Sequence, residues 1–520
     1  MLKHTEGFQV KASIRKKLTR RKRRIERRLR PKKFKERSQP MLAAANIQYD
    51  VAERSRGLAA GGIGGMHLLA QKMGLVEAID RHVHVLKRHL PYHESDHVLN
   101  IAYNILAGGR RLEHIELRRN DEVYLDALGA ERIPDPTTAG DFCRRFERRD
   151  IELLMDAINE TRLKVWRQQP AEFFEEALLD ADGTIVETFG ECKRGMDISY
   201  NGKWGYHPLL ISLANTAEPL YLVNRSGNRP SHEGAAEYFD RAIVLCRRAG
   251  FRKVTLRGDT DFTQTKHLDR WDADGVEFLF GADATLNVRL EAELLESEVW
   301  EQLERPPKYE VRTQPRQRPQ NVKERIVVQR NFKNIRLLSE DVAEFDYQPT
   351  ACRKTDRMIV VRKNLSVRSG QWELFPDMRY FFYLTNDCTT PADKLVLKAN
   401  RRCNQENLIE QLSNGVRALS APLDNLESNW ADMVIASLAW TLKAWTALSL
   451  PETGRWAEKH REEKRRLLHM EFATFTNAFI QLPCQIIRTG RRIVYRLLSW
   501  NPWQHVFLRL IERLHGRQLC

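Results

Sequence analysis

The stretch ALLDADGTIV, residues 177–186, decides the fold. An apolar run precedes Asp180 and Asp182, and residues 184–186 continue the pattern, which predicts a strand whose alternate residues share one face. Both carboxylates are therefore expected to point the same way. An Asp-Gly pair after an apolar run is also typical of a turn. Because Asp is depleted in strands and costly to bury without a partner such as a metal ion, these residues are candidates for a functional site.

The chain that follows predicts a mixed sheet. Two strand-like runs, 207–215 and 219–227, are separated by a short polar turn, and a helical stretch over 233–249 is followed by Gly250, which is placed to stop it. Residues 253–259 then predict a buried strand that ends in Asp259. The order strand, strand, strand, helix, strand is the arrangement of a ribonuclease H-like domain, in which adjacent central strands present the ligands.

A third acidic signal lies far along the chain, in the segment NQENLIEQLSNGV, residues 404–416. Its apolar residues make a helical stripe, with Asn404 as cap and Glu406 in the first turn. A Glu there usually complements the helix dipole, and Glu410, one turn later, is the competing candidate. Arg402 and its polar neighbours make a basic surface that suits a DNA backbone.

Phosphoryl transfer is a reaction in which these three acidic residues could act together, as ligands of metal ions. It uses two hard cations about 3.5 to 4 Å apart, which activate the attacking oxygen and stabilise the leaving oxygen. Since Mg²⁺ keeps several waters, two or three carboxylates from separate elements are enough to hold it. We therefore predict that Asp182, Asp259 and Glu406 are the catalytic residues and hold two Mg²⁺ (or Mn²⁺) ions, with Asp180 and Asp261 as alternatives.

The motifs LDADGT, GYHPLL, RSGN and LRGDTDF, with the Arg402-x-x-x-Glu406 spacing, resemble the DDE-class insertion-sequence transposases. The likeness covers most of the chain and is greatest to the bacterial IS "thirteen-eighty" group, which is related to the hairpin-forming cut-and-paste branch. It implies a catalytic triad of Asp182, Asp259 and Glu406, with Arg402 holding the DNA end. The related branch often has a Tyr and a Lys where this chain has Ala399 and Ser413, so those two roles do not transfer.

Positive charge is concentrated at the start of the chain. Residues 1–40 contain 17 Lys or Arg against three Glu, a net +14 of the total +16. Such a block neutralises phosphates and gives a salt-dependent affinity that is largely independent of DNA sequence. The predicted DNA-binding residues here are Arg20, Arg21, Lys22, Arg23 and Arg24.

Residues 41–170 predict a helical domain with its own apolar periodicity. Its segment PDPTTAGDFCRRFERR offers Thr137 or Thr138 as a helix cap, with Arg144 and Arg145 on the following helix, much like a DNA-docking helix after a turn. The same arginine face is common in helices that never touch DNA. We predict that this domain binds the transposon ends.

Asp259 and Glu406 are 147 positions apart, which is more than one helix and a loop of such a core would need, so an insertion is expected. Its strand-like composition over 286–387 predicts an all-β insertion. In the hairpin-forming relatives that the chain resembles, an aromatic residue of the insertion stacks on a flipped base. The resemblance makes Trp372, on a turn-like tip, or Trp300 a candidate for this role, although a core position is the more common outcome for a tryptophan.

The apolar run 433–451 is long enough to suggest a membrane helix, but Lys443 in its middle favours a helix packed on the core. The remainder predicts a basic, amphipathic helical region. The predicted organisation is a basic disordered DNA-binding arm (1–40), a helical N-terminal DNA-binding domain (41–170), the first part of a ribonuclease H-like core (171–285), a β-rich insertion (286–387), the second part of the core with the Glu406 helix (388–450) and a basic helical C-terminal region (451–520).

The sequence thus predicts a DNA transposase of mixed α/β class, acting as a dimer on double-stranded transposon ends and target DNA, with no membrane contact. A non-catalytic DNA-binding protein with a degenerate core and a nuclease without strand transfer stay open as alternatives. Eight scattered cysteines with no Cys-x-x-Cys pair suit a reducing cytoplasm, and the expected location is cytoplasmic and nucleoid-associated.

Overall fold

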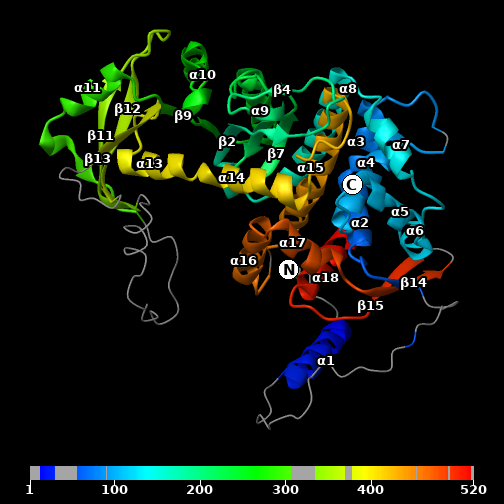
Figure 1. The fold of residues 1–520 in the computed structure, drawn as a ribbon. Helices are drawn as coiled ribbons and strands as arrows, with labels where there is room; N and C mark the ends of the chain where they lie inside the picture. The colour runs from blue at the N-terminus through cyan, green and yellow to red at the C-terminus, as the bar shows by residue number, and fades with distance from the viewer. Residues whose placement is uncertain are drawn as a thin grey trace.

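The computed structural model describes residues 12–29, 48, 56–89, 91–305, 334–368, 377–452, 454–489 and 492–516. Within these ranges the protein is a mixed α/β structure in which one large sheet lies beside a helical domain, as Figure 1 shows. The predicted α/β class is confirmed.

The large sheet has nine strands in the order β10-β11-β12-β13-β9-β8-β2-β6-β7. Its members are β2 (Glu176–Gly183), β6 (Leu209–Leu213), β7 (Glu218–Val223), β8 (Lys253–Gly258), β9 (Glu277–Ala282), β10 (Glu301–Gln302), β11 (Asn334–Tyr347), β12 (Asp356–Arg368) and β13 (Asp377–Thr385). Strands β2, β6 and β7 form an antiparallel meander, whereas β8 runs parallel to β2 and β9 parallel to β8. This is the order predicted from the acidic strand onward, and β9 extends it.

The first acidic strand ends sooner than predicted. Strand β2 stops at Gly183, and Val186 belongs to a separate small sheet of β3 (Val186–Glu187), β5 (Trp204–Tyr206) and β4 (Asp197–Ile198). Gly183, the last residue of β2, packs closely against the His207 ring. A Cβ on Gly183 would lie 2.8 Å from Nε2 of that ring.

Helices cover the sheet. Helix α9 (Ala235–Ala249) packs on β2, β6, β7 and β8, and ends at Gly250, whose φ of 105° is the left-handed conformation predicted for a helix stop. The short α10 (Leu268–Ala273) links β8 to β9. Helices α13 (Ala392–Asn400) and α14 (Cys403–Glu410) follow one another as a rod across the strands (Figure 1), and a single π-helical turn, Gln411–Gly415, continues it.

The strands of the insertion join this same sheet. Strand β13 pairs with β9, and β12, β11 and β10 follow outward. The expectation of an all-β insertion is wrong in one respect, because residues 286–293 form helix α11 (Leu286–Glu293), which buries Val288 and Ala292 against the core. Part of the predicted insertion, residues 306–333 and 369–376, lies outside the described residues.

The N-terminal domain is helical, as predicted. Its helices are α2 (Ile63–Met73), α3 (Leu75–His82), α4 (Glu94–Leu106), α5 (Ile115–Arg119), α6 (Glu122–Leu128), α7 (Pro136–Cys143) and α8 (Arg148–Trp166). A buried carboxylate, Glu218 of β7, ties this domain to the sheet: it accepts hydrogen bonds from Arg162 and Trp166 of α8 and from Trp445 of α15 (Leu426–Leu448). All but the first two residues of α15 are buried, which confirms the prediction of a core helix, and no described helix is both long and apolar enough to span a bilayer.

The two ends of the chain differ from their predictions. Residues 12–29, expected to be disordered, form helix α1 (Ala12–Leu29), and Arg21 of α1 donates hydrogen bonds to the carbonyls of Leu497 and Ser499, at 2.9 and 3.1 Å. The C-terminal region contains the helices α16 (Ala457–Leu468), α17 (Phe472–Phe475) and α18 (Gln504–Gly516), but the stretch between α17 and α18 is a hairpin of β14 (Cys484–Thr489) and β15 (Arg492–Leu497) rather than a helix. The hairpin is stabilised by a distant partner, because β1 (Gly57–Leu58) adds to it as a third strand.

Candidate functional site

Two of the three predicted acids meet at one edge of the sheet. Asp182 lies on β2, opposite Leu210 of β6, and Asp259 directly follows β8. Since β2 and β8 are parallel neighbours, their carboxyl ends open at the same edge. The topology of the sheet therefore brings together two carboxylates that are 77 positions apart in the sequence.

An arginine stands between these two carboxylates. Arg402, at the start of α14, places Nη1 3.1 Å from a carboxylate oxygen of Asp182 and Nη2 3.9 Å from one of Asp259. The Arg402 side chain is 20% exposed, that of Asp182 16% and that of Asp259 40%, so the cluster can be reached from solvent. Arg402 is the one predicted DNA-binding residue that the structure brings to the acids.

Both carboxyl groups are harder to ionise than usual. Burial raises the pKa of Asp182 to about 6, against the opposing effect of the Arg402 guanidinium and with a further contribution from Asp259. Burial also raises the pKa of Asp259, again opposed by Arg402, and the charge of Asp261 adds to the rise. One arginine thus only partly offsets the cost of holding two negative charges at this edge.

Asp180, the alternative to Asp182, has a different partner. Its two oxygens accept hydrogen bonds from Nε and Nη2 of Arg257 on β8, at 2.7 and 2.8 Å, and both side chains are 1% exposed. A bidentate pair of this kind leaves the Asp180 carboxylate without access to a ligand. Asp180 is therefore a structural residue beside the site, although it does lie on the same face of β2 as Asp182.

Glu406 lies on α14, one turn after Arg402, and its side chain is exposed. The helix begins earlier than predicted: Asn404 lies inside α14 and Arg402 holds the cap position. Among the described residues, no group of three or more His, Cys, Asp or Glu side chains is close enough together to hold a metal ion. The structure thus brings Asp182 and Asp259 together but does not add Glu406 to them as a third ligand. Glu410 is engaged locally, since it accepts hydrogen bonds from Gln411 and Asn414.

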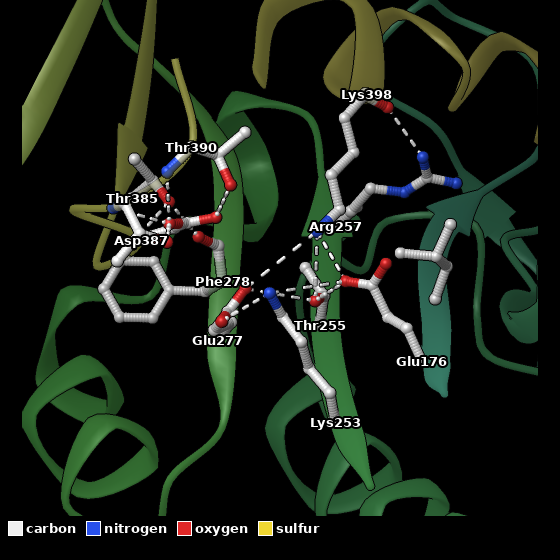
Figure 2. Close-up of polar contacts among 12 residues, drawn as sticks. Glu176, Lys253, Thr255, Arg257, Glu277, Phe278, Thr385, Asp387, Thr390 and Lys398 are labelled. Carbon is white, nitrogen blue, oxygen red and sulfur yellow. Dashed lines mark hydrogen bonds and ion pairs between the residues drawn. The ribbon is translucent and has the colours of Figure 1, made fainter. Parts of the chain in front are cut away.

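The rod that carries Arg402 and Glu406 is fixed to the sheet by a network of charges, which Figure 2 shows. Lys398 of α13 places its Nζ 2.6 Å from a carboxylate oxygen of Glu176 on β2 and 4.0 Å from one of Glu277 on β9. The backbone carbonyl of Lys398 accepts a hydrogen bond from Arg257, the partner of Asp180, at 2.6 Å. Further along, Gln405 of α14 points inward and accepts a hydrogen bond from Ser212 of β6.

His207 is a site residue that the sequence analysis did not single out. It is 3% exposed, its Nδ1 lies 2.7 Å from the carbonyl of Arg229, and its ring packs against Gly183, next to Asp182. Burial lowers the pKa of His207, so the imidazole is neutral near pH 7. The GYHPLL motif could have pointed to it, because a histidine that opens a buried strand beside an acidic strand is an unusual choice for a core position.

The other predicted DNA-binding arginines lie away from the acids. The cap of α7 is Asp135 rather than Thr137 or Thr138, and Arg144 and Arg145 lie between α7 and α8 rather than on a helix. Arg144 pairs with Asp141 and with Asp424, at 2.8 and 2.9 Å, so part of its charge stabilises a contact between segments of the protein. Of the α1 residues, Arg21 holds α1 to the C-terminal region, while Arg20, Lys22, Arg23 and Arg24 are exposed.

Trp300, the tryptophan of the insertion that the structure describes, is not placed to stack on a base. Trp372 lies outside the described residues. Trp300 is partly buried against the core, and the guanidinium of Arg362 lies 4.1 Å from the centre of its ring. The face that a base would need is therefore occupied.

The arrangement can bind two kinds of charge. Two partly exposed carboxylates at a strand edge supply oxygen ligands for a hard divalent cation, and the guanidinium of Arg402 can bind a phosphate oxygen. The charge network around Lys398 holds the rod that carries Arg402 to the sheet. The site suits chemistry on a phosphate ester.

A search of the curated proteins found no match. Among solved structures, a cryo-electron microscopy structure of the piggyBac transposase synaptic complex with hairpin DNA is similar, with 11% sequence identity, 81% of each chain covered and a TM-score of 0.34. The family model described as "Transposase DDE domain group 1" matches residues 54–518, nearly the whole chain. This protein therefore belongs to the transposase DDE domain group 1 family.

Proposed function

We propose that this protein is a DNA transposase that binds the ends of its insertion sequence and catalyses metal-dependent strand cleavage and strand transfer by a cut-and-paste route. The observation that carries the proposal is the meeting of Asp182 and Asp259 at the ends of adjacent parallel strands, around Arg402. Membership of a transposase DDE domain family supports a role for this pair of acids in DNA strand cleavage and transfer.

We assign the sheet to the ribonuclease H-like type, on the grounds of its strand order: an antiparallel meander of β2, β6 and β7, followed by the parallel strands β8 and β9. Within the family, the motifs LDADGT and LRGDTDF favour the IS "thirteen-eighty" group. The insertion between Asp259 and Glu406 continues the sheet outward, which gives the protein a longer surface for DNA than the core alone.

The residues fit a divalent cation. Asp182 and Asp259 supply carboxylate oxygens as metal ligands. Their pKa values are raised because burial disfavours the charged carboxylates and one arginine does not fully offset this effect. A doubly charged ion would stabilise both charged carboxylates. When bound, two Mg²⁺ or Mn²⁺ ions would activate the attacking oxygen and stabilise the leaving oxygen. Asp182 and Asp259 would hold the ions, and Arg402 would be released to contact the scissile strand.

Glu406 is the proposed third ligand. It lies on the same helix as Arg402, four residues later, and therefore on nearly the same helical face. We infer that it joins the two aspartates when ions and DNA are bound. The π-helical turn directly after α14 supports this, because such turns are frequent at functional sites. His207 would keep its position as a neutral neighbour that fixes the turn at Gly183.

The proposed partners are double-stranded DNA of the transposon ends and of the target, bound by a dimer. The 3′-hydroxyl released by the first nick would attack the opposite strand and close a hairpin, which frees the 3′ end of the flanking DNA. Water would then hydrolyse the hairpin and release the 3′-hydroxyl again, and this hydroxyl would attack the target. No covalent bond between protein and DNA is needed at any step.

The test uses the purified full chain with a labelled duplex that carries a terminal repeat from the DNA flanking its gene. Asp182→Asn, Asp259→Asn and Glu406→Gln should each abolish Mg²⁺-dependent nicking and leave duplex binding intact. Glu410→Gln, a matched loss of one carboxylate on the same helix, should cut normally. Cleavage retained by all three site variants would reject the assignment.

A second assay separates transposition from simple hydrolysis. The wild-type protein is given a pre-cut end with a free 3′-hydroxyl and a supercoiled target plasmid, and joined products are measured. Joining is expected. Cleavage without joining would identify a nuclease of the same fold, and neither activity would leave a DNA-binding protein with a degenerate core.

A further inference from the structure

A basic cleft lies far from the acids, where α1 meets the C-terminal region. It has a volume of about 610 Å³, and its walls come from residues 15–22 of α1, residues 456–460 at the start of α16, and residues 500–509 around the start of α18. Figure 1 shows α1 beneath the C-terminal helices. The hydrogen bonds from Arg21 to the carbonyls of Leu497 and Ser499 hold α1 against that region.

Positive charge dominates the lining of this cleft. Arg15, Lys22, Lys459 and Arg509 all line it, and none of its described lining residues is acidic. Two carboxylates stand beside these cations: Glu26, 3.6 Å from Lys22, and Glu463, which is 3.8 Å from Lys459 and 2.6 Å from Arg509. Four permanent positive charges thus face two negative ones, and the cleft keeps a surplus that favours an anion.

Two tryptophans line the same cleft. Trp456 is 51% exposed, although indole is one of the largest apolar side chains, and the guanidinium of Arg455 lies 5.4 Å from the centre of its ring, farther than Arg362 lies from Trp300. Trp500 is half-buried. An exposed indole next to cations is the pairing by which proteins bind unpaired nucleic acid, because a base stacks on the ring while the phosphates meet the charges. An acidic peptide would use the charges but would gain little from the two indoles.

The size of the cleft decides between a single strand and a duplex. Clefts of about 300 to 1,000 Å³ hold ligands of drug size, which for a nucleic acid means one or two nucleotides. A duplex is wide enough to take an α-helix into its major groove, so it cannot enter such a space, and its bases are already stacked on each other. We propose that this cleft binds unpaired nucleotides of a DNA strand, with a base on Trp456 and the adjoining phosphates on Arg15 and Lys459.

This inference rests on the proposed function for its choice of DNA as the nucleic acid. It adds a second DNA-binding surface, specific for unpaired strand, at a composite site that needs both ends of the chain. A strand freed by cleavage is the kind of DNA that would supply such nucleotides.

The experiment measures the fluorescence anisotropy of a labelled short oligothymidylate and of a blunt duplex of the same length, using the full-length protein without added metal. Trp456→Ala should weaken oligothymidylate binding about tenfold and leave duplex binding unchanged. Trp456→Phe, which keeps an aromatic face, should retain most of the affinity. The thermal melting of each variant is recorded, and Lys459→Ala is a second, exposed variant in case Trp456→Ala does not fold.

A matched pair on α1 separates the cleft from general electrostatics. Arg15 lines the cleft and Arg24 does not, yet each substitution by Ala removes one charge from the same helix. Arg15→Ala should weaken oligothymidylate binding more than Arg24→Ala. Equal losses of affinity from the two, equal losses on single strand and duplex, or competition by polyglutamate as strong as by unlabelled oligothymidylate would each overturn the proposal.

These outcomes are independent of the nicking assay. If the protein nicks DNA but Trp456→Ala binds oligothymidylate as tightly as the wild type does, the cleft proposal fails and the transposase proposal stands. If binding depends on Trp456 but no variant or condition gives metal-dependent nicking, the cleft stands and the proposed function fails.

Discussion

At the scale of single residues, the acidic strand shows what a sequence pattern can and cannot distinguish. Alternation along the strand correctly predicted that Asp180 and Asp182 share a face, because that depends only on strand geometry. It could not distinguish their roles. The difference lies in Arg257, 77 positions away from Asp180 in the sequence, which pairs with Asp180 and buries it completely.

This difference predicts opposite phenotypes for two neighbouring substitutions. Asp180→Asn leaves the Arg257 guanidinium buried without its counter-charge and should destabilise the fold by about 3 to 5 kcal/mol. Asp182→Asn should change stability little, because Arg402 is partly exposed and keeps Asp259 nearby, but it should abolish strand cleavage. Urea unfolding and the nicking assay measure the two effects separately.

The double variant Asp180→Leu with Arg257→Met is the control, since replacing both members of a buried ion pair by apolar residues is often close to neutral. It should recover much of the stability that Asp180→Asn removes. If Asp180→Asn folded as well as the wild type and lost only cleavage, Asp180 rather than Asp182 would be the functional residue.

At the scale of elements, predictions succeeded where the apolar pattern and end residues of a segment indicated the same structure that its contacts in the fold favour. The strands β6, β7 and β8 and the helix α9 with its Gly250 stop were predicted with small errors at their ends. The hairpin of β14 and β15 was missed, because its basic, apolar-spaced sequence also suits an amphipathic helix. Its pairing with β1, more than 400 residues earlier, is a contact that no local pattern contains.

Helix α15 carries a prediction of its own, because it buries an ionisable group in an apolar stretch. Lys443 is 1% exposed; its Nζ donates a hydrogen bond to the carbonyl of Leu468 at 2.8 Å and lies 3.6 Å from the centre of the Trp440 ring. Burial lowers the pKa of Lys443 to about 7. Between about pH 7 and the ordinary lysine value of 10.5, the unfolded chain binds the proton that the folded chain has released, so stability should rise with pH in this window.

Lys443→Met keeps the apolar stem and removes the titrating group. It should raise the free energy of unfolding at pH 7 by about 1 to 3 kcal/mol and remove that part of the rise toward pH 10, both measured by urea unfolding at several pH values. Lys394→Met, at a position whose side chain is 65% exposed, is the control and should leave the pH profile unchanged. A less stable Lys443→Met protein would show that the contacts with Leu468 and Trp440 outweigh the cost of burial.

At the scale of the whole molecule, the two ends of the chain assemble into one region. Strand β1 pairs with β14, and α1 is held by the carbonyls at the end of β15. The charge of the N-terminal segment was predictable by counting residues, but its docking was not. The docking depends on backbone carbonyls, and because every residue has one, the sequence does not indicate which of them will accept a hydrogen bond. The candidate site has the same limit: the sequence identified Asp182, Asp259 and Arg402 separately, and only the fold shows that Arg402 stands between the acids.

The docked α1 helix gives the last prediction, which concerns the salt dependence of duplex binding. The helix carries ten Lys or Arg against one Glu, so deleting residues 1–29 should make the slope of log K against log salt shallower by about 0.9 for each phosphate that the helix neutralises. Arg21→Lys keeps the charge but replaces the planar guanidinium, whose Nη1 donates to both carbonyls, by a flexible ammonium group; it should loosen α1 while leaving the slope near the wild-type value. Anisotropy titrations of one duplex at several salt concentrations measure both, and an unchanged slope after the deletion would mean that α1 binds no phosphates and serves only as a structural support for the C-terminal region.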